Sequence, residues 1–92
     1  MTKTVLVVED ELPIATLLKY NLEQAGFDVL LAHDGQAGLD TAVERTPDLM
    51  LLDLMLPKLD GVEVCKELRR LRMNVPIIML TARDDEFDKV LG

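Results

Sequence analysis

The sequence has little of three things that mark whole classes of protein: cysteine, long apolar runs and positive charge. Its single cysteine, Cys65, excludes an intrachain disulfide framework and fits a reducing compartment. Its longest apolar runs have four residues, which excludes a membrane-spanning helix, and Glu9 and Asp10 come too early for a signal-peptide core. We therefore expect a cytoplasmic chain without membrane contact.

Positive charge is scarce, since 10 Lys and Arg face 17 Asp and Glu, for a net charge of −7. This balance repels nucleic acid and anionic lipid, and it favours cation binding. The composition, 49% hydrophobic and 29% charged over 92 residues, is that of one small globular domain, residues 1–92.

Four apolar runs organise the chain: residues 5–8, 29–32, 49–52 and 77–80. Each run is continuous rather than alternating, which is typical of strands buried on both faces of a parallel sheet. Helical spacing between the runs predicts alternating strands and helices, and therefore an α/β fold with right-handed crossovers. Handedness places the first helix on one face of the sheet and the later helices on the other.

The first expected helix has the clearest helical spacing. Pro13 suits the first turn of the first helix and Gly26 its C-terminal cap. Its predicted buried face is Ile14, Leu17, Leu18, Leu22 and Ala25.

The second helix is expected over residues 36–44, with Asp34 as N-cap, and the third after Asp60 and Gly61. A fourth is expected from about Asp85 or Glu86. The predicted buried residues of the second and third helices are Leu39, Ala42, Val43, Val62, Cys65, Leu68 and Leu71.

Acidic side chains follow the predicted strands where those strands end. Glu9 and Asp10 follow the first strand and Asp53 follows the third, with Thr81 after the fourth. The carboxyl ends of parallel strands share one edge, so the three carboxylates should converge if the first and third strands are neighbours. Clustered carboxylates suit a hard cation such as Mg²⁺.

A zinc site is disfavoured because His33 and Cys65 lie on different elements without ligand spacing. A carboxylate beside Mg²⁺ can attack phosphorus, and the Thr81 hydroxyl could donate to a phosphoryl oxygen, so phosphoryl transfer is the natural chemistry. Spacing alone does not choose the nucleophile.

Three separated motifs decide among these alternatives. Residues 7–11 read VVEDE, residues 53–57 read DLMLP with Asp60 and Gly61 following, and residues 80–83 read LTAR. In this order and with these gaps, the whole chain resembles the receiver domain of bacterial response regulators, in particular the OmpR/PhoB-type branch of transcription factors. The resemblance implies a flavodoxin-like (CheY-like) doubly wound sheet, with strand order 2-1-3-4 for the strands present.

The resemblance also implies roles for single residues. Asp53 would be the phosphoacceptor, Asp10 and Asp53 direct Mg²⁺ ligands, Glu9 a ligand through water, and the Met55 main-chain carbonyl a further ligand. Thr81 would be the switch hydroxyl. The phosphoryl donor would be the phosphohistidine of a sensor histidine kinase, and the output would be transcription regulation through an attached DNA-binding domain.

The family's fifth strand, with its lysine, has no counterpart in residues 1–92, so the chain reads as a receiver truncated before its fifth strand and helix. We expect the fourth strand to be an exposed edge, the chain to self-associate or dimerise there, and phosphorylation to be impaired.

Two readings compete with the signalling one. A Mg²⁺-dependent phosphohydrolase is weaker, because position 55 is methionine where a D-x-D arrangement needs a second acid. A structural or assembly segment would carry the same acidic pocket in an idle state. The signalling reading is preferred, and it makes the chain a phosphoacceptor rather than an enzyme.

Overall fold

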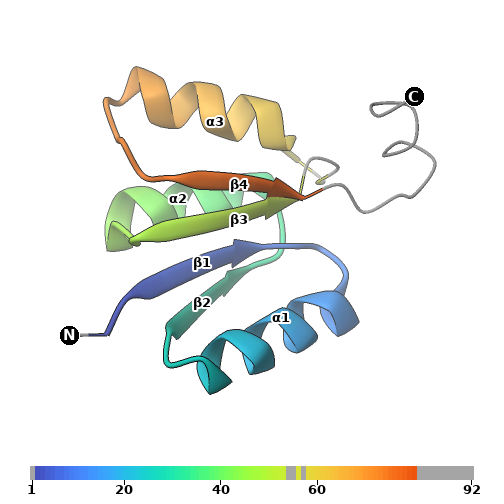
Figure 1. Cartoon of the computed structure of the whole chain (residues 1–92). Helices are drawn as coiled ribbons and strands as arrows, with labels where there is room; N and C mark the ends of the chain where they lie inside the picture. Colours follow the sequence, from blue (N-terminus) through green and yellow to red (C-terminus); the bar gives the residue numbers. More distant parts are fainter. Residues whose placement is uncertain (1, 54–55, 57, 81–92) are drawn as a thin grey trace, which may run out of the picture.

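The computed structural model describes residues 2–53, 56 and 58–80. Strands and helices alternate along this part of the chain (Figure 1). Their bounds are β1 (Thr4–Val8), α1 (Leu12–Gln24), β2 (Asp28–Ala32), α2 (Gly35–Arg45), β3 (Leu49–Asp53), α3 (Gly61–Arg70) and β4 (Ile77–Leu80). Each predicted strand is confirmed to within one residue at either end. The predicted fourth helix lies outside the described residues.

The strands form one parallel sheet in the order β2-β1-β3-β4, as expected. β1 is central and pairs with both β2 and β3, so that Val8 is in register with Ala32 on one side and Leu52 on the other. The first and third strands are therefore neighbours, and their carboxyl ends lie at the same edge of the sheet.

The helices cover both faces, as the handedness of the crossovers requires. α1 lies apart from α2 and α3, which share one face (Figure 1). The core on the shared face contains Leu6 and Val8 of β1 with Val64 and Leu68 of α3. Val5 and Val7 alternate with Leu6 and Val8 and are also buried, so they face the α1 side of the sheet.

Local signals place the helix ends. The Asp34 carboxylate accepts a hydrogen bond from the Ala37 N–H at 2.7 Å, and the Asp60 carboxylate accepts one from the Glu63 N–H at 3.0 Å. Both are N-caps, as the sequence predicts for Asp34. Gly26 follows α1 at φ 97°, a left-handed conformation that favours glycine.

α2 packs closely on β1 because position 38 has no side chain. A Cβ on Gly38 would lie 2.8 Å from both methyl carbons of Val8, too close for an ordinary contact. The helix therefore packs directly against Val8, the residue before Glu9.

Parts of the predicted helix faces are wrong. Leu17 is 61% exposed and Ala25 is exposed, because the buried position of α1 is Ala15 and its apolar residues extend around the helix. Val43 of α2 is also exposed. The remaining predicted residues of α1 and α2 are buried or half-buried.

In α3 the buried stripe is Gly61, Val64 and Leu68, so the predicted Val62 and Leu71 lie to one side of it and are exposed. Cys65 is half-buried and Leu68 is buried, as predicted. Gly61, a small residue at the start of the helix, occupies one of the buried positions. A prediction based on large apolar residues does not identify it and so misplaces the buried face.

The sheet is less covered toward β4. Among the described residues β4 pairs with a strand on one side only, at the edge of the sheet. Ile78, which is in register with Leu51, is 50% exposed, and Met79 is 39% exposed. Within the described ranges, no helix has the length and apolar character needed to cross a bilayer.

Candidate metal and phosphoacceptor site

The candidate site lies where β1 and β3 end. Leu52 is in register with Val8, so Asp53, the last residue of β3, lies opposite the start of the segment after β1. The Glu9 N–H donates to the Ala32 carbonyl at 2.9 Å, which ties this segment to the end of β2 as well. The pairing of Val8 on both sides and the bond from Glu9 to Ala32 therefore fix the backbone that carries the Glu9 side chain.

The structure brings together the three carboxylates that the sequence predicts to converge. Glu9, Asp10 and Asp53 each offer one oxygen atom, and these three atoms all lie within 4.8 Å of one another. Glu9 and Asp53 are each only 2% exposed, while Asp10 is exposed. The cluster thus has two buried members and one that faces solvent.

Burial and crowding change the acidity of Glu9. Its pKa is raised to about 7, first because burial desolvates the charged carboxylate, and further by the hydrogen bond to Asp53 and the negative charge of Asp53. The Glu11 N–H, which donates to Glu9 Oε2 at 3.1 Å, opposes this shift. Between about pH 4.5 and 7, Glu9 therefore retains a proton that an ordinary glutamate would lose.

Such a donor set fits a divalent hard cation. Carboxylate oxygens are the preferred ligands of Mg²⁺ and Ca²⁺, and Mg²⁺ typically takes one or two of them while keeping several waters. A cation among the three oxygens would offset the repulsion that raises the Glu9 pKa. His33 and Cys65 are not members of this cluster.

Other acids at the same edge have separate tasks. Asp34 and Asp60 cap α2 and α3, because helices that follow parallel strands begin at this edge. The Ala37 N–H, and to a lesser extent Lys58, hold the pKa of Asp34 below its usual value. Part of the negative charge of the chain therefore caps helices and does not belong to the site.

Met55 and Thr81, the other two predicted site residues, lie outside the described residues. Their roles as a carbonyl ligand and a hydroxyl donor stay predictions. Asp53 is the last residue of the described strand and Leu80 the last described residue before Thr81, and these two are partners in the register of β3 and β4.

One contact was missed from the sequence. His33 Nδ1 lies 3.2 Å from the Glu9 carbonyl oxygen, so the histidine that follows β2 supports the backbone of the site. Its position directly after a strand run is the signal that could have found it. Cys65 lies on α3 and makes no such contact with the described residues of the site. Burial raises the pKa of its thiol, which disfavours the reactive thiolate.

The chain resembles known proteins over its whole length. It is 60% identical over 92 residues to the alkaline phosphatase synthesis transcriptional regulatory protein PhoP of Bacillus subtilis, and this match covers 100% of the chain but 38% of that protein. The chain therefore spans less than half the length of this curated relative.

Solved receiver domains share the fold. The Francisella response regulator 1452 receiver domain matches with a TM-score of 0.86 and 35% identity, over 99% of this chain and 75% of that one. The BeF3-activated N-terminal receiver domain of Klebsiella pneumoniae RstA matches with a TM-score of 0.83 and 33% identity, over 96% of this chain and 74% of that one.

Residues 5–91 match the family described as the response regulator receiver domain, and this range includes all three clustered carboxylates. The family is a regulatory one rather than a family of ordinary enzymes. The matched range, the strand order and the identity to PhoP agree, and the chain belongs to the receiver-domain family of two-component response regulators.

Proposed function

We propose that this chain is a phosphorylation-dependent receiver in which Asp53 accepts a phosphoryl group from the phosphohistidine of a sensor histidine kinase. The observation that carries the proposal is the convergence of Glu9, Asp10 and Asp53 within 4.8 Å at the carboxyl edge of the sheet. Asp53 is the nucleophile of choice because it is buried and ends β3, an inner strand that pairs with both β1 and β4.

The reaction is a displacement at phosphorus. A carboxylate oxygen of Asp53 forms a bond to phosphorus, the bond from phosphorus to the imidazole nitrogen breaks, and its electron pair returns to the imidazole. Bound Mg²⁺ supplies charge neutralisation for the carboxylates and the phosphoryl oxygens. Asp10 and Asp53 would hold it directly, Glu9 through water and Met55 through its carbonyl, while the Thr81 hydroxyl donates to a phosphoryl oxygen.

The consequence of phosphorylation would be a shift between two conformations that partners distinguish. The PhoP relative is a transcriptional regulatory protein, so we propose that this receiver acts in the cytoplasm on an attached DNA-binding domain. The receiver itself makes no contact with DNA in this proposal, consistent with its net charge of −7.

Two measurements on matched variants test the phosphoacceptor role. Calorimetric titration with Mg²⁺ should give saturable heat for the unaltered chain, and incubation with acetyl phosphate and Mg²⁺ should add one phosphoryl group by mass spectrometry. Asp53→Asn should abolish the adduct. Asp48→Asn, the same change at the other edge of the sheet, should leave it unchanged. An adduct that survives Asp53→Asn would refute the assignment.

A second proposal concerns the edge of the sheet, where the exposure of Ile78 and Met79 favours self-association. A second copy could pair with β4 and cover the apolar side chains of its two faces. If this association were the main role, the acidic pocket would be idle, as in an assembly segment.

Sedimentation velocity across a concentration series tests the edge. Ile78→Lys should shift the chain toward monomer, whereas Leu17→Lys, a matched change at an exposed leucine of α1, should not. A monomer at all concentrations would contradict self-association, and a defined oligomer without Mg²⁺ heat would favour the idle-pocket role.

A further inference from the structure

The end of β2 contacts the main chain of Glu9 at both of its polar groups. The Glu9 N–H donates to the Ala32 carbonyl at 2.9 Å, and His33 Nδ1 lies 3.2 Å from the Glu9 carbonyl oxygen. Val8 and Ala32 are the last pair in the register of β1 and β2, so Glu9 and His33 come next on the two chains. The histidine side chain thus extends the pairing of β1 and β2 by one residue.

The chemistry of the two atoms fixes the direction of this hydrogen bond. A carbonyl oxygen can only accept, so the proton lies on Nδ1 of His33 and the imidazole donates. A neutral imidazole carries one proton, and the hydrogen bond that the ring makes decides which nitrogen holds it. The geometry therefore corresponds to the Nδ1–H form of His33, which can be measured directly.

Both neighbours of His33 along the chain are fixed. Ala32 ends β2 and is buried. Asp34 is the N-cap of α2, and its carboxylate accepts a hydrogen bond from the Ala37 N–H at 2.7 Å. A donor on a backbone that is already fixed loses little further conformational entropy when it makes its bond. His33 is therefore well placed to restrain the atom that it contacts.

That atom belongs to the peptide group that joins two members of the acidic cluster. The Glu9 carbonyl and the Asp10 N–H lie in one planar unit. Bonds from Glu9 to Ala32 and from His33 to Glu9 set the orientation of this plane. The plane in turn sets the direction in which the chain reaches Asp10, and so where the Asp10 carboxylate lies relative to those of Glu9 and Asp53.

Asp10 depends on this restraint more than the other two carboxylates do. Glu9 and Asp53 are buried, so close packing holds their side chains. The Glu11 N–H also donates to the Glu9 carboxylate at 3.1 Å. Asp10 is exposed, so its position depends more on the course of the main chain that carries it.

We infer that His33 is a positioning residue for the acidic cluster, because its Nδ1–H holds the peptide between Glu9 and Asp10 in the orientation in which the three carboxylates converge. This inference rests on the proposed Mg²⁺-dependent phosphoacceptor function and deepens it. His33 touches neither the cation nor the phosphoryl group in this proposal. Its influence reaches the Asp10 carboxylate through one hydrogen bond and the covalent chain.

The test separates the hydrogen-bond donor from the bulk of the side chain. Leucine and asparagine have the same branching, but only asparagine carries an N–H, at the same number of bonds from Cα as histidine Nδ1. In calorimetry, His33→Leu should weaken Mg²⁺ binding by roughly threefold to tenfold, the range that one hydrogen bond represents. His33→Asn should restore the affinity to within about twofold of the unaltered chain, because it restores the donor.

Asn21→Leu is the matched control. Asn21 is exposed, and its Nδ2 donates to the Leu17 carbonyl at 3.0 Å, so it makes the same kind of bond from a side chain to the main chain. This bond lies within α1, toward the end of the helix that is far from the acidic cluster. Its loss should leave Mg²⁺ affinity unchanged. Circular dichroism checks that each variant is folded, as the exposure of both positions leads us to expect.

Two NMR measurements without Mg²⁺ test the restraint itself. At about pH 8.5, where a histidine is neutral, proton–nitrogen correlation spectra of the His33 ring should place the proton on Nδ1. The amide signal of Asp10 should shift in His33→Leu and stay near its original position in His33→Asn and Asn21→Leu. This amide belongs to the peptide group that His33 holds, and a general loss of stability would not move its signal selectively.

Equal Mg²⁺ affinity in His33→Leu and the unaltered chain would overturn the inference. Equal losses in His33→Leu and His33→Asn would overturn it as well, because the donor would then be irrelevant, and so would a ring proton on Nε2. A failure of the unaltered chain to bind Mg²⁺ would be a different result. It would overturn the proposed function and, with it, this inference.

Discussion

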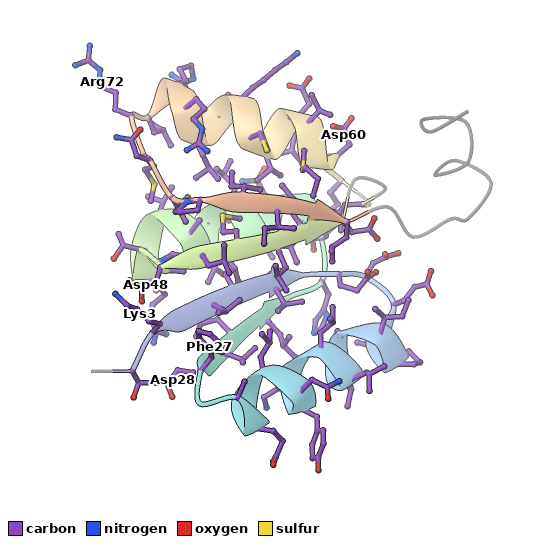
Figure 2. The ribbon with its side chains drawn as sticks, in the orientation of Figure 1. Lys3, Phe27, Asp28, Asp48, Asp60 and Arg72 are labelled. Atoms are coloured by element: carbon purple, nitrogen blue, oxygen red, sulfur yellow. The ribbon has the colours of Figure 1, made fainter. Side chains whose placement is uncertain are left out.

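Carboxylates lie at both edges of the sheet, and the two edges use them in different ways. Lys3, Asp28 and Asp48 lie at the amino edge (Figure 2). There the Asp48 carboxylate accepts a hydrogen bond from the Thr4 N–H at 2.8 Å. At the carboxyl edge, Glu9 and two aspartates each place a carboxylate oxygen within 4.8 Å of the other two. One edge uses an acid to satisfy the backbone, and the other concentrates negative charge where a cation can neutralise it.

The difference follows from strand polarity. At the amino edge, strands begin with N–H groups, which a carboxylate such as that of Asp48 can cap individually. At the carboxyl edge, loops to the helices leave room for several acids from different strands to meet. Aspartate is therefore structural at the amino edge, whereas at the carboxyl edge it both caps helices, as Asp34 and Asp60 do, and belongs to a candidate site for chemistry.

The largest expected effect at the carboxyl edge is on metal affinity. Asp10 is exposed, so Asp10→Asn should preserve the fold while removing one charged ligand. We expect Mg²⁺ affinity to fall by about a hundredfold, or about 2.7 kcal/mol, as measured by calorimetry. Asp48→Asn is the matched control, and equal losses in the two variants would show that the edges do not differ.

The next effect is a pH dependence confined to the carboxyl edge. Glu9 has a pKa of about 7 in the folded chain and 4.5 as its ordinary value, so the folded chain binds the extra proton. Its contribution to stability is complete below about pH 4.5 and is lost as pH rises toward 7. We expect the free energy of unfolding to change by an amount on the order of 2 kcal/mol. This is less than the same pKa shift would give for an isolated group, because the shift belongs to a cluster of interacting acids.

Urea unfolding without Mg²⁺ at several pH values measures this effect. Glu9→Gln, which is neutral at every pH, should lack the decline that the unaltered chain shows between pH 4.5 and 7. Saturating Mg²⁺ should remove the decline as well, because the cation favours the ionised carboxylate. Parallel pH profiles for the two chains would contradict the raised Glu9 pKa.

The architecture of both edges was predictable because strand polarity can be read from the sequence. Continuous apolar runs located the strands, and each acid directly after a run had to lie at the carboxyl edge. The degree of burial was not predictable in the same way. Nothing local distinguishes Glu9, which is buried, from Asp10, which is exposed, because the difference depends on packing between distant elements.

The helix faces show the same limit. Leu17 and Val62 fit a helical period but are exposed, while the small residues Ala15 and Gly61 occupy the buried positions. A prediction from hydrophobic periodicity assigns the largest apolar side chains to the buried face of a helix. Where a helix packs closely on a sheet, however, small side chains occupy the positions nearest the strands. The Gly38 contact with Val8 was hidden for the same reason, since it depends on an absent side chain.

At the amino edge the expected effect is smaller and concerns stability alone. Asp48→Ala removes the acceptor of the Thr4 N–H, and one such bond at an exposed site contributes about 0.5–1 kcal/mol. The free energy of unfolding should fall by this amount, while Mg²⁺ affinity stays within error of the unaltered chain. A loss of affinity in Asp48→Ala would show that the far edge influences the site through the sheet.

The smallest expected effect separates local geometry from total charge. Asp28 begins β2 at the amino edge and is exposed, so Asp28→Asn removes a negative charge without removing a ligand. A strand of this length separates it from the acidic cluster by about 16 Å, beyond the Debye length of about 8 Å in physiological salt. Mg²⁺ affinity should therefore be unchanged in physiological salt and fall slightly, by less than about twofold, in low salt. A larger loss, equal to that in Asp10→Asn, would mean that the overall negative charge of the chain attracts the cation and that the convergence of the three carboxylates adds nothing.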